Sequence, residues 1–294
     1  MRESGTFYII IAAMLWGTTG TAQALAPQGA TPLAISALRL IVAAGLLVAI
    51  WIWQRHIREK QDLSLSRREI VWLMLAGGCL ALYQLTFFAG VLRTGVAVGT
   101  LVAIGSAPIF AGIFGAWLEA DTLTTRWYIA MIASIIGCGL LVSAGQGVVI
   151  VDRWGIALAL GAGLSYVLYT VASKRLLVNQ TSETAMAFSF TIGAILLSPL
   201  LFFVDISWVL DVRGLLVIGH LGGIATAVAY MLFGYGLRTV SVSRIGTLTL
   251  AEPLTATLLG ILLLHEPISP TVLGGCGCIL CGLLVLTMPH NKRG

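Results

Sequence analysis

Ten apolar stretches of about 20 residues, separated by short polar or charged connections, make up most of this 294-residue sequence. They cover residues 7–26, 32–53, 70–91, 95–118, 127–146, 154–173, 184–204, 214–236, 245–264 and 270–288. A bilayer core of ~30 Å is crossed by ~20 apolar residues in an α-helix. The stretches are unbroken and do not alternate with polar residues as strands of a membrane β-barrel would. We therefore expect an all-α integral membrane protein with ten transmembrane helices.

The scarcity of charge supports this interpretation. Only 10% of the residues are charged, whereas a soluble domain carries roughly 25%. A soluble chain of this composition would have too little polar surface. The composition thus excludes a cytosolic enzyme, a nucleic-acid-binding protein, a disordered protein and a secreted disulfide scaffold.

The distribution of lysine and arginine predicts the orientation. With a cytoplasmic N-terminus and ten crossings, 13 of the 17 basic residues lie on the inner side and three on the outer side. Cytoplasmic loops carry the excess of positive charge, so both termini are expected in the cytoplasm. The net charge of +5 then reflects topology, and no nucleic-acid partner is expected. A cleavable signal peptide ending near Ala24 is the alternative interpretation of the first stretch.

The two halves of the sequence resemble each other. Leu-Arg-Thr at residues 92–94 recurs 145 residues later at 237–239, and at the same offset Pro108 matches Pro253 and Asp121 matches Glu266. The unit contains five crossings, an odd number, so its second copy enters the membrane from the opposite side. We expect two inverted five-helix repeats, residues 1–146 and 147–294, which is an architecture of transporters with the solute site at the repeat interface.

The repeated residues resemble the drug/metabolite transporter superfamily, and its EamA-type families in particular. The matching residues are Trp-Gly at 16–17, Ala-Leu-Arg at 37–39, Pro108, Glu-Pro at 252–253, and an acidic residue after each of the two proline-containing crossings. The first half usually has Gly-Glu there, and this chain has Leu-Glu-Ala-Asp at 118–121. Among subfamilies, the chain is most similar to the YddG-type aromatic amino-acid exporters.

The resemblance implies a multi-pass carrier of the bacterial cytoplasmic (inner) membrane that exports small organic solutes, most often amino acids or related metabolites. Nucleosides or drugs are alternative solutes. An intramembrane enzyme is the alternative function, but His220 is the only histidine deep in a stretch, and no cluster of embedded acids is present. No cofactor or metal is expected. The oligomeric state is left open, and a monomer would suffice.

Two charged residues, Arg39 and Glu252, fall deep inside apolar stretches. A charge at that depth costs ~2.5–3.5 kcal/mol, so each should face a cavity or a partner. Because the two lie at different expected depths, no direct salt bridge between them is predicted. Arg39 either stabilises helix ends or binds a solute carboxylate, or its side chain extends outward to the interface. Glu252 either packs at a gate or binds a proton or an amine, and His220 is either titratable or a neutral core residue.

The uncharged candidates for solute binding share helix faces. Trp16, Thr19 and Gln23 follow helical spacing on the first stretch. Embedded tyrosines and tryptophans need a polar partner that lipid tails do not offer. The predicted solute-binding residues are Trp16, Thr19, Gln23, Tyr83, Gln84, Ser165, Tyr169 and Tyr230, and the predicted coupling or gating residues are Arg39, His220, Glu252, Pro108 and Pro253. Such a cavity suits a neutral or zwitterionic solute with an apolar side chain, whereas a phosphorylated solute would require several deep lysines or arginines.

Overall fold

The computed structural model describes residues 2–57, 65–144, 152–265 and 267–288, and all regular secondary structure within these ranges is helical. The helices are α1 (Arg2–Ala24), α2 (Pro32–Ile57), α3 (Arg67–Glu119), α4 (Thr125–Ala144), α5 (Arg153–Leu176), α6 (Ser182–Leu197), η1 (Ser198–Phe202), η2 (Ser207–Leu210), α7 (Val212–Gly219), η3 (His220–Val228), α8 (Ala229–Leu237), α9 (Val242–Leu248), α10 (Ala251–Leu263) and α11 (Pro270–Thr287). The prediction of an all-helical membrane protein is confirmed.

The described residues contain nine stretches that are long and apolar enough to cross a membrane. The remaining candidate, α1, has 23 residues, which at 1.5 Å per residue reaches ~30 Å or more. Four of its residues, Ile9, Ala12, Ala13 and Trp16, are buried in the core of the bundle. α1 therefore packs as an integral helix of the bundle, among the nine stretches.

Two crossings are joined within α3 without a loop. The chain leaves helical geometry only at Gly95, with φ +81°, a conformation that glycine adopts without steric cost. A Cβ atom on Gly99 would lie 2.9 Å from the Cα of Val91, so the chain reverses direction there. The connection expected at residues 92–94 is thus part of a tight reversal.

The contacts made by a crossing of the first half are repeated by the crossing five positions later in the chain. α1 packs against α8 and α10, while α5 packs against both halves of α3. Three further pairs, α2 with α6, α3 with α9, and α4 with α11, each join one crossing of the first half to the corresponding crossing of the second. The predicted boundary between residues 146 and 147, and Glu266 of the repeat motif, lie outside the described residues.

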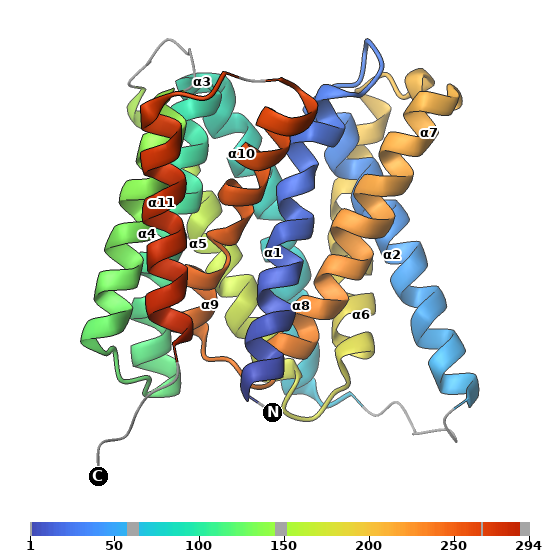
Figure 1. The fold of residues 1–294 in the computed structure, drawn as a ribbon. Coiled ribbons are helices and arrows are strands. Elements are labelled where there is room, and N and C mark those ends of the chain that lie inside the picture. Colours follow the sequence, from blue (N-terminus) through green and yellow to red (C-terminus); the bar gives the residue numbers. More distant parts are fainter. Residues whose placement is uncertain (1, 58–64, 145–151, 266, 289–294) are drawn as a thin grey trace.

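The first described helix begins, and the last one ends, at the same end of the bundle. α1 begins at the lower end in Figure 1, and α11 ends there. We call this the terminal end, and the opposite end, where α1 ends and α2 begins, the distal end. The depth of a residue in the bundle is described below as nearer to the terminal end or nearer to the distal end.

Candidate functional site

A cavity of about 690 Å³ lies between the helices of the two halves. Nine of the thirteen predicted site residues line it, namely Trp16, Thr19, Gln23, Arg39, Tyr83, Gln84, Tyr230, Glu252 and Pro253. The volume falls within the roughly 300–1,000 Å³ typical of small-molecule sites. The structure thus brings together residues from five separate crossings that the sequence offered only as isolated candidates.

The cavity extends to the distal end of the bundle. Its lining includes Ala24 and Pro32, on either side of the α1–α2 connection, and Val142 and Leu264 at the distal ends of their helices. α2 contributes residues only from its distal third, between Pro32 and Leu40. The space therefore runs from the middle of the bundle to the distal end.

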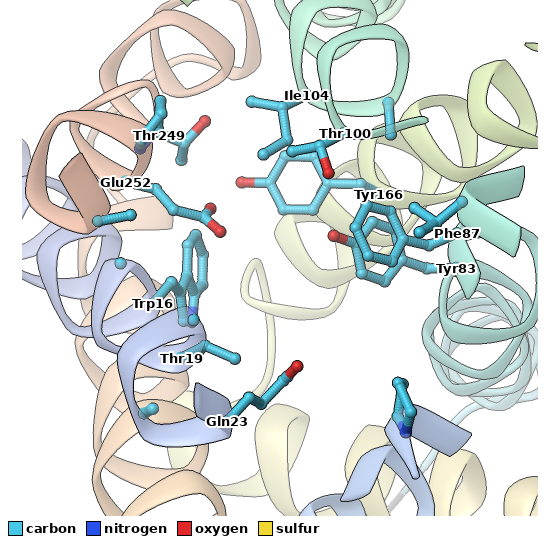
Figure 2. Close-up of a pocket in the computed structure, with 18 of the residues that line it drawn as sticks. Trp16, Thr19, Gln23, Tyr83, Phe87, Thr100, Ile104, Tyr166, Thr249 and Glu252 are labelled. Carbon is cyan, nitrogen blue, oxygen red and sulfur yellow. The ribbon is translucent and has the colours of Figure 1, made fainter. Parts of the chain in front are cut away.

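One wall of the cavity is formed by α1. Trp16, Thr19 and Gln23 point into the cavity from one face of this helix (Figure 2), as their helical spacing predicts. Gly17 packs against the neighbouring helix, where a Cβ atom would lie 2.6 Å from the carbonyl oxygen of Glu252. This close approach sets the Trp16 indole beside the Glu252 side chain at the cavity surface (Figure 2).

The two embedded charges face this cavity and do not pair with each other. The Arg39 Nη2 atom donates a hydrogen bond to the Gln84 Oε1 atom at 3.0 Å, and the buried Arg39 Nε atom has no partner. Neither Arg39 nor Glu252 forms an ion pair within the described part of the chain, in contrast to Arg93, which pairs with Asp152 on the surface. Arg39 and Glu252 thus contribute one positive and one negative group to the same cavity.

The buried indole Nε1 atom of Trp16 also lacks a hydrogen-bond partner. Buried polar groups are nearly always satisfied, and exceptions call for an explanation. Trp16 lines the cavity, and its indole N–H group has no acceptor among the described residues.

A cluster of aromatic rings bounds the cavity toward the terminal end. This aromatic floor consists of Trp16, Tyr166, Tyr169, Phe190, Tyr230 and Phe233. Ring centroids lie 4.9 Å apart for Trp16 and Tyr230, 4.6 Å for Phe190 and Tyr230, and 5.2 Å for Trp16 and Phe233. Phe233 and Tyr169 are completely or almost completely buried. The floor therefore separates the cavity from the terminal end.

Polar contacts below the floor hold the terminal end together. The Ser243 hydroxyl donates to the Asp121 Oδ2 atom at 2.7 Å, and the Trp127 indole donates to the Ser243 carbonyl oxygen at 2.8 Å. The Tyr235 hydroxyl donates to the Glu183 carboxylate at 2.7 Å. We call the group of Asp121, Trp127 and Ser243 the terminal latch, because it joins the α3–α4 region to α9.

The crossing that carries Glu252 is interrupted beside the cavity. α9 ends at Leu248 and α10 begins at Ala251, with Pro253 in its first turn. Proline has no N–H group to donate to the preceding helical turn, which accounts for the break. Thr249 and Glu252, on either side of it, both line the cavity and face the Tyr83 and Tyr166 side chains across it (Figure 2).

Four predicted site residues do not line the cavity. Tyr169 lies one turn nearer the terminal end than Tyr166, so it is part of the floor, and its hydroxyl contacts the Met186 sulfur atom at 3.2 Å. The Ser165 hydroxyl instead donates to the Gly161 carbonyl oxygen of its own helix. Helical spacing relates residues within α5 but does not give the depth at which the cavity ends, so it could not place these two residues relative to the cavity.

The other two residues outside the lining, which were predicted for coupling or gating, face neighbouring helices. Pro108 is buried where α3 packs against Gly246 of α9. His220, the first residue of the π-helical segment η3, has its Nε2 atom 2.8 Å from the Thr18 hydroxyl oxygen. Because the Thr18 hydroxyl donates to the Leu15 carbonyl oxygen, it accepts from the His220 Nε2–H group, and His220 lies outside the cavity lining.

Several lining residues were not among the predicted site residues. They include Phe87, Phe88, Thr100, Tyr166, Phe190, Thr226 and Thr249. Three had a signal in the sequence. Tyr166 is an embedded tyrosine, whose hydroxyl needs a polar partner that lipid tails do not offer. Phe87 is four residues from Tyr83, and Thr249 is three residues from Glu252, so each shares a helix face with a predicted site residue. The others depend on how the helices are placed against one another.

Comparison with known proteins agrees with the helical arrangement. A crystal structure in which 22% of the aligned residues are identical superposes with a TM-score of 0.83 and covers 97% of this chain and 96% of the other. At this identity the likeness concerns the fold alone.

Related sequences carry transporter names. An uncharacterized transporter of Bacillus subtilis, YwfM, is 43% identical over 98% of this chain and 95% of its own length. The threonine/homoserine exporter RhtA of Escherichia coli strain K12 is 26% identical over 85% of this chain and 79% of its own length. The EamA-like transporter family model matches twice, at residues 3–143 and 153–288. This chain is a multi-pass membrane transporter that belongs to the EamA-like transporter family.

Proposed function

We propose that this transporter exports zwitterionic organic solutes, chiefly amino acids with apolar or aromatic side chains, across the bacterial cytoplasmic membrane. The observation that carries the proposal is that Arg39 and Glu252 face one cavity without pairing with each other. An α-amino acid carries a carboxylate that can bind Arg39 and an ammonium group that can bind Glu252. Each embedded charge would then gain a partner from the solute, which offsets part of its cost in the membrane.

The remainder of the lining supports an apolar side chain on the solute. Trp16, Tyr83, Phe87, Tyr166 and Tyr230 supply aromatic surface around the charged pair. Aromatic and apolar walls with a few polar groups are typical of sites for small organic molecules. A cavity with one arginine and no lysine in its lining lacks the several cations that a phosphorylated solute would require.

The expected orientation of the chain in the membrane supports a cavity that opens toward the exterior of the cell. The excess of lysine and arginine on the terminal side is expected in the cytoplasm. The distal end then faces the exterior, and the conformation described here is open to the outside. In the proposed cycle, residues 1–146 and 147–294 act as inverted repeats, and their relative movement closes the distal end and opens the terminal end.

The relative RhtA supports the solute class by its name, threonine/homoserine exporter. The solutes proposed for this chain differ from those in the name of RhtA, because the aromatic lining favours side chains that are larger and more apolar than that of threonine. The finer resemblance to YddG-type exporters remains a prediction, and the panel of solutes described next tests it.

The test is efflux from proteoliposomes loaded with single radiolabelled solutes. The panel contains phenylalanine, leucine, threonine, glutamate and a nucleoside, each measured with and without a pH gradient. We expect phenylalanine and leucine to leave fastest. Efflux of the nucleoside alone would overturn the proposal in favour of another solute class, and efflux that ignores the pH gradient would exclude Glu252 as a site of obligatory proton coupling.

A matched pair of variants ties the flux to the cavity. Trp16→Ala removes an aromatic wall with an unpartnered indole and should lower phenylalanine efflux about tenfold. Trp53→Ala makes the same change at a side chain that is 64% exposed on α2, and its efflux should be unchanged. Equal efflux from both variants, with equal amounts of folded protein, would contradict the placement of the solute.

A further inference from the structure

We infer that Gln84 is a positioning residue that orients Arg39 toward a solute carboxylate and so makes the site selective for free α-amino acids over their amides and amines. The inference rests on the proposed function of the cavity. It adds that the solute is recognised by its carboxylate and that Gln84 makes this recognition selective.

The Gln84 amide is well placed to hold the guanidinium group. Gln84 is only 5% exposed and comes from α3, which faces Arg39 of α2 across the cavity wall. Its Oε1 atom accepts the hydrogen bond from the Arg39 Nη2 atom at 3.0 Å. One corner of a planar, rigid donor group is thereby fixed, which restricts the directions in which its other N–H groups point.

The remaining donors of Arg39 are not all satisfied by the protein. The buried Nε atom has no hydrogen-bond partner. A guanidinium group presents its N–H groups as a fork that matches a carboxylate. Arg39 lines the cavity, and the printed hydrogen bond engages its Nη2 atom alone, so other N–H groups of the guanidinium remain to donate to a ligand.

Because residue 84 is a neutral glutamine, the positive charge of Arg39 is not compensated by this neighbour. A glutamine oxygen accepts a hydrogen bond but carries no net charge, and no carboxylate of the described residues lies within 4.0 Å of the Arg39 nitrogen atoms. A glutamate in the same place would neutralise Arg39 and take the position of the solute carboxylate. Gln84 therefore supports Arg39 without competing with the solute.

This arrangement predicts a specific pattern of selectivity. A hydrogen bond to a charged group contributes ~1.5–3 kcal/mol, so loss of the solute carboxylate should weaken binding about tenfold or more. Phenylalanine, phenylalaninamide and phenethylamine share one side chain and one amino group and differ at the carboxylate. The ratio of their dissociation constants therefore reports on Arg39, while effects on folding or on the aromatic lining cancel.

The experiment measures these three dissociation constants by calorimetry on the full-length protein in detergent. We expect the wild type to prefer phenylalanine to the amide and the amine by about tenfold or more. Gln84→Glu should abolish this preference or reverse it toward the amine. Gln84→Met is similar in size but has no acceptor, and it should reduce the preference. It takes the place of the glutamate variant if that variant does not fold.

The control is Leu85→Met, on the next residue of α3, whose side chain is 40% exposed on the outer surface of the bundle. It should retain the wild-type preference. A wild-type preference that persists in both Gln84 variants would overturn the positioning role while leaving the proposed solute class intact. Failure of the wild type to bind phenylalanine at all would overturn the inference together with the proposed function.

Discussion

The two ends of the helix bundle differ although the same helices run through both. Toward the distal end, Arg39 and Glu252 line an open cavity without forming an ion pair with each other. Toward the terminal end, Asp121, Trp127 and Ser243 satisfy one another, and the aromatic floor fills the interior. The cavity thus leaves one cation and one carboxylate available to a solute, whereas the closed end is joined by hydrogen bonds between helices and by ring packing.

The largest expected effect comes from removing a distal group. Arg39→Met deletes the cation proposed to bind the solute carboxylate and should lower kcat/KM for phenylalanine efflux about a hundredfold. Arg93→Met makes the same substitution at the distal surface, where Arg93 is 3.6 Å from Asp152 and exposed, and exposed pairs contribute little. Comparable losses in the two variants would break the distinction between cavity and surface.

The second effect concerns the aromatic floor. Phe233→Ala removes a completely buried ring that contacts Trp16, Tyr166, Tyr169 and Tyr230. The loss of packing should lower the free energy of unfolding by about 3 kcal/mol and allow solute to leak through the terminal end. Thermal unfolding and passive uptake measure the two consequences.

Phe203→Ala is the control for this variant, because Phe203 is 85% exposed near the distal end. Its thermal midpoint and leak should equal those of the wild type. An intact barrier in Phe233→Ala would show that the terminal latch alone closes the passage.

The third effect sharpens the role of the terminal latch. Ser243→Ala removes the hydroxyl that donates to the Asp121 carboxylate at 2.7 Å, in a buried position. The conformation open at the terminal end should become about tenfold more populated, since a hydrogen bond to a charged group is lost. A single cysteine introduced at Thr257, in a background without the five native cysteines, reports the change as slower labelling from the distal side.

Ser207→Ala is the matched control for the latch. The Ser207 hydroxyl donates to the Asp205 carboxylate at 2.9 Å, but this contact is exposed and lies within one loop. Removing it should leave the labelling rate unchanged. If both serine variants label alike, the latch does not bias the conformational equilibrium.

The smallest effect belongs to an exposed carboxylate at the distal surface. The backbone N–H groups of Gly155 and Trp154, together with Arg93, hold the pKa of Asp152 below its usual value. A carboxylate with a lowered pKa stabilises the fold above its unfolded pKa, and this contribution disappears as the pH falls through its folded pKa. Asp152→Asn should therefore lower the thermal midpoint by about 2 °C or less at neutral pH, and the difference from the wild type should vanish in acid. A difference that grows in acid would contradict the assignment.

Much of the cavity could be predicted because its residues are constrained within single helices. Trp16, Thr19 and Gln23 share a face by spacing alone, and Arg39 and Glu252 are too costly in lipid to face outward. Tyr83, Gln84 and Tyr230 also line the cavity, as expected. Ser165, Tyr169, Pro108 and His220 lie outside the cavity lining, and spacing within a helix could not indicate this because it does not reveal which neighbour covers a given face.

The sequence by itself determined the helical class, the approximate crossings, the internal repeat and the two embedded charges. It did so because a chain in lipid must satisfy its backbone hydrogen bonds within each segment and conceal its charges. Only the tertiary structure decided that Gln84 holds Arg39, that the aromatic floor lies below the cavity, and that Asp121 meets Ser243 across 122 positions of sequence. These contacts depend on the relative depth and rotation of packed helices, which arise from side-chain packing between segments far apart in the chain.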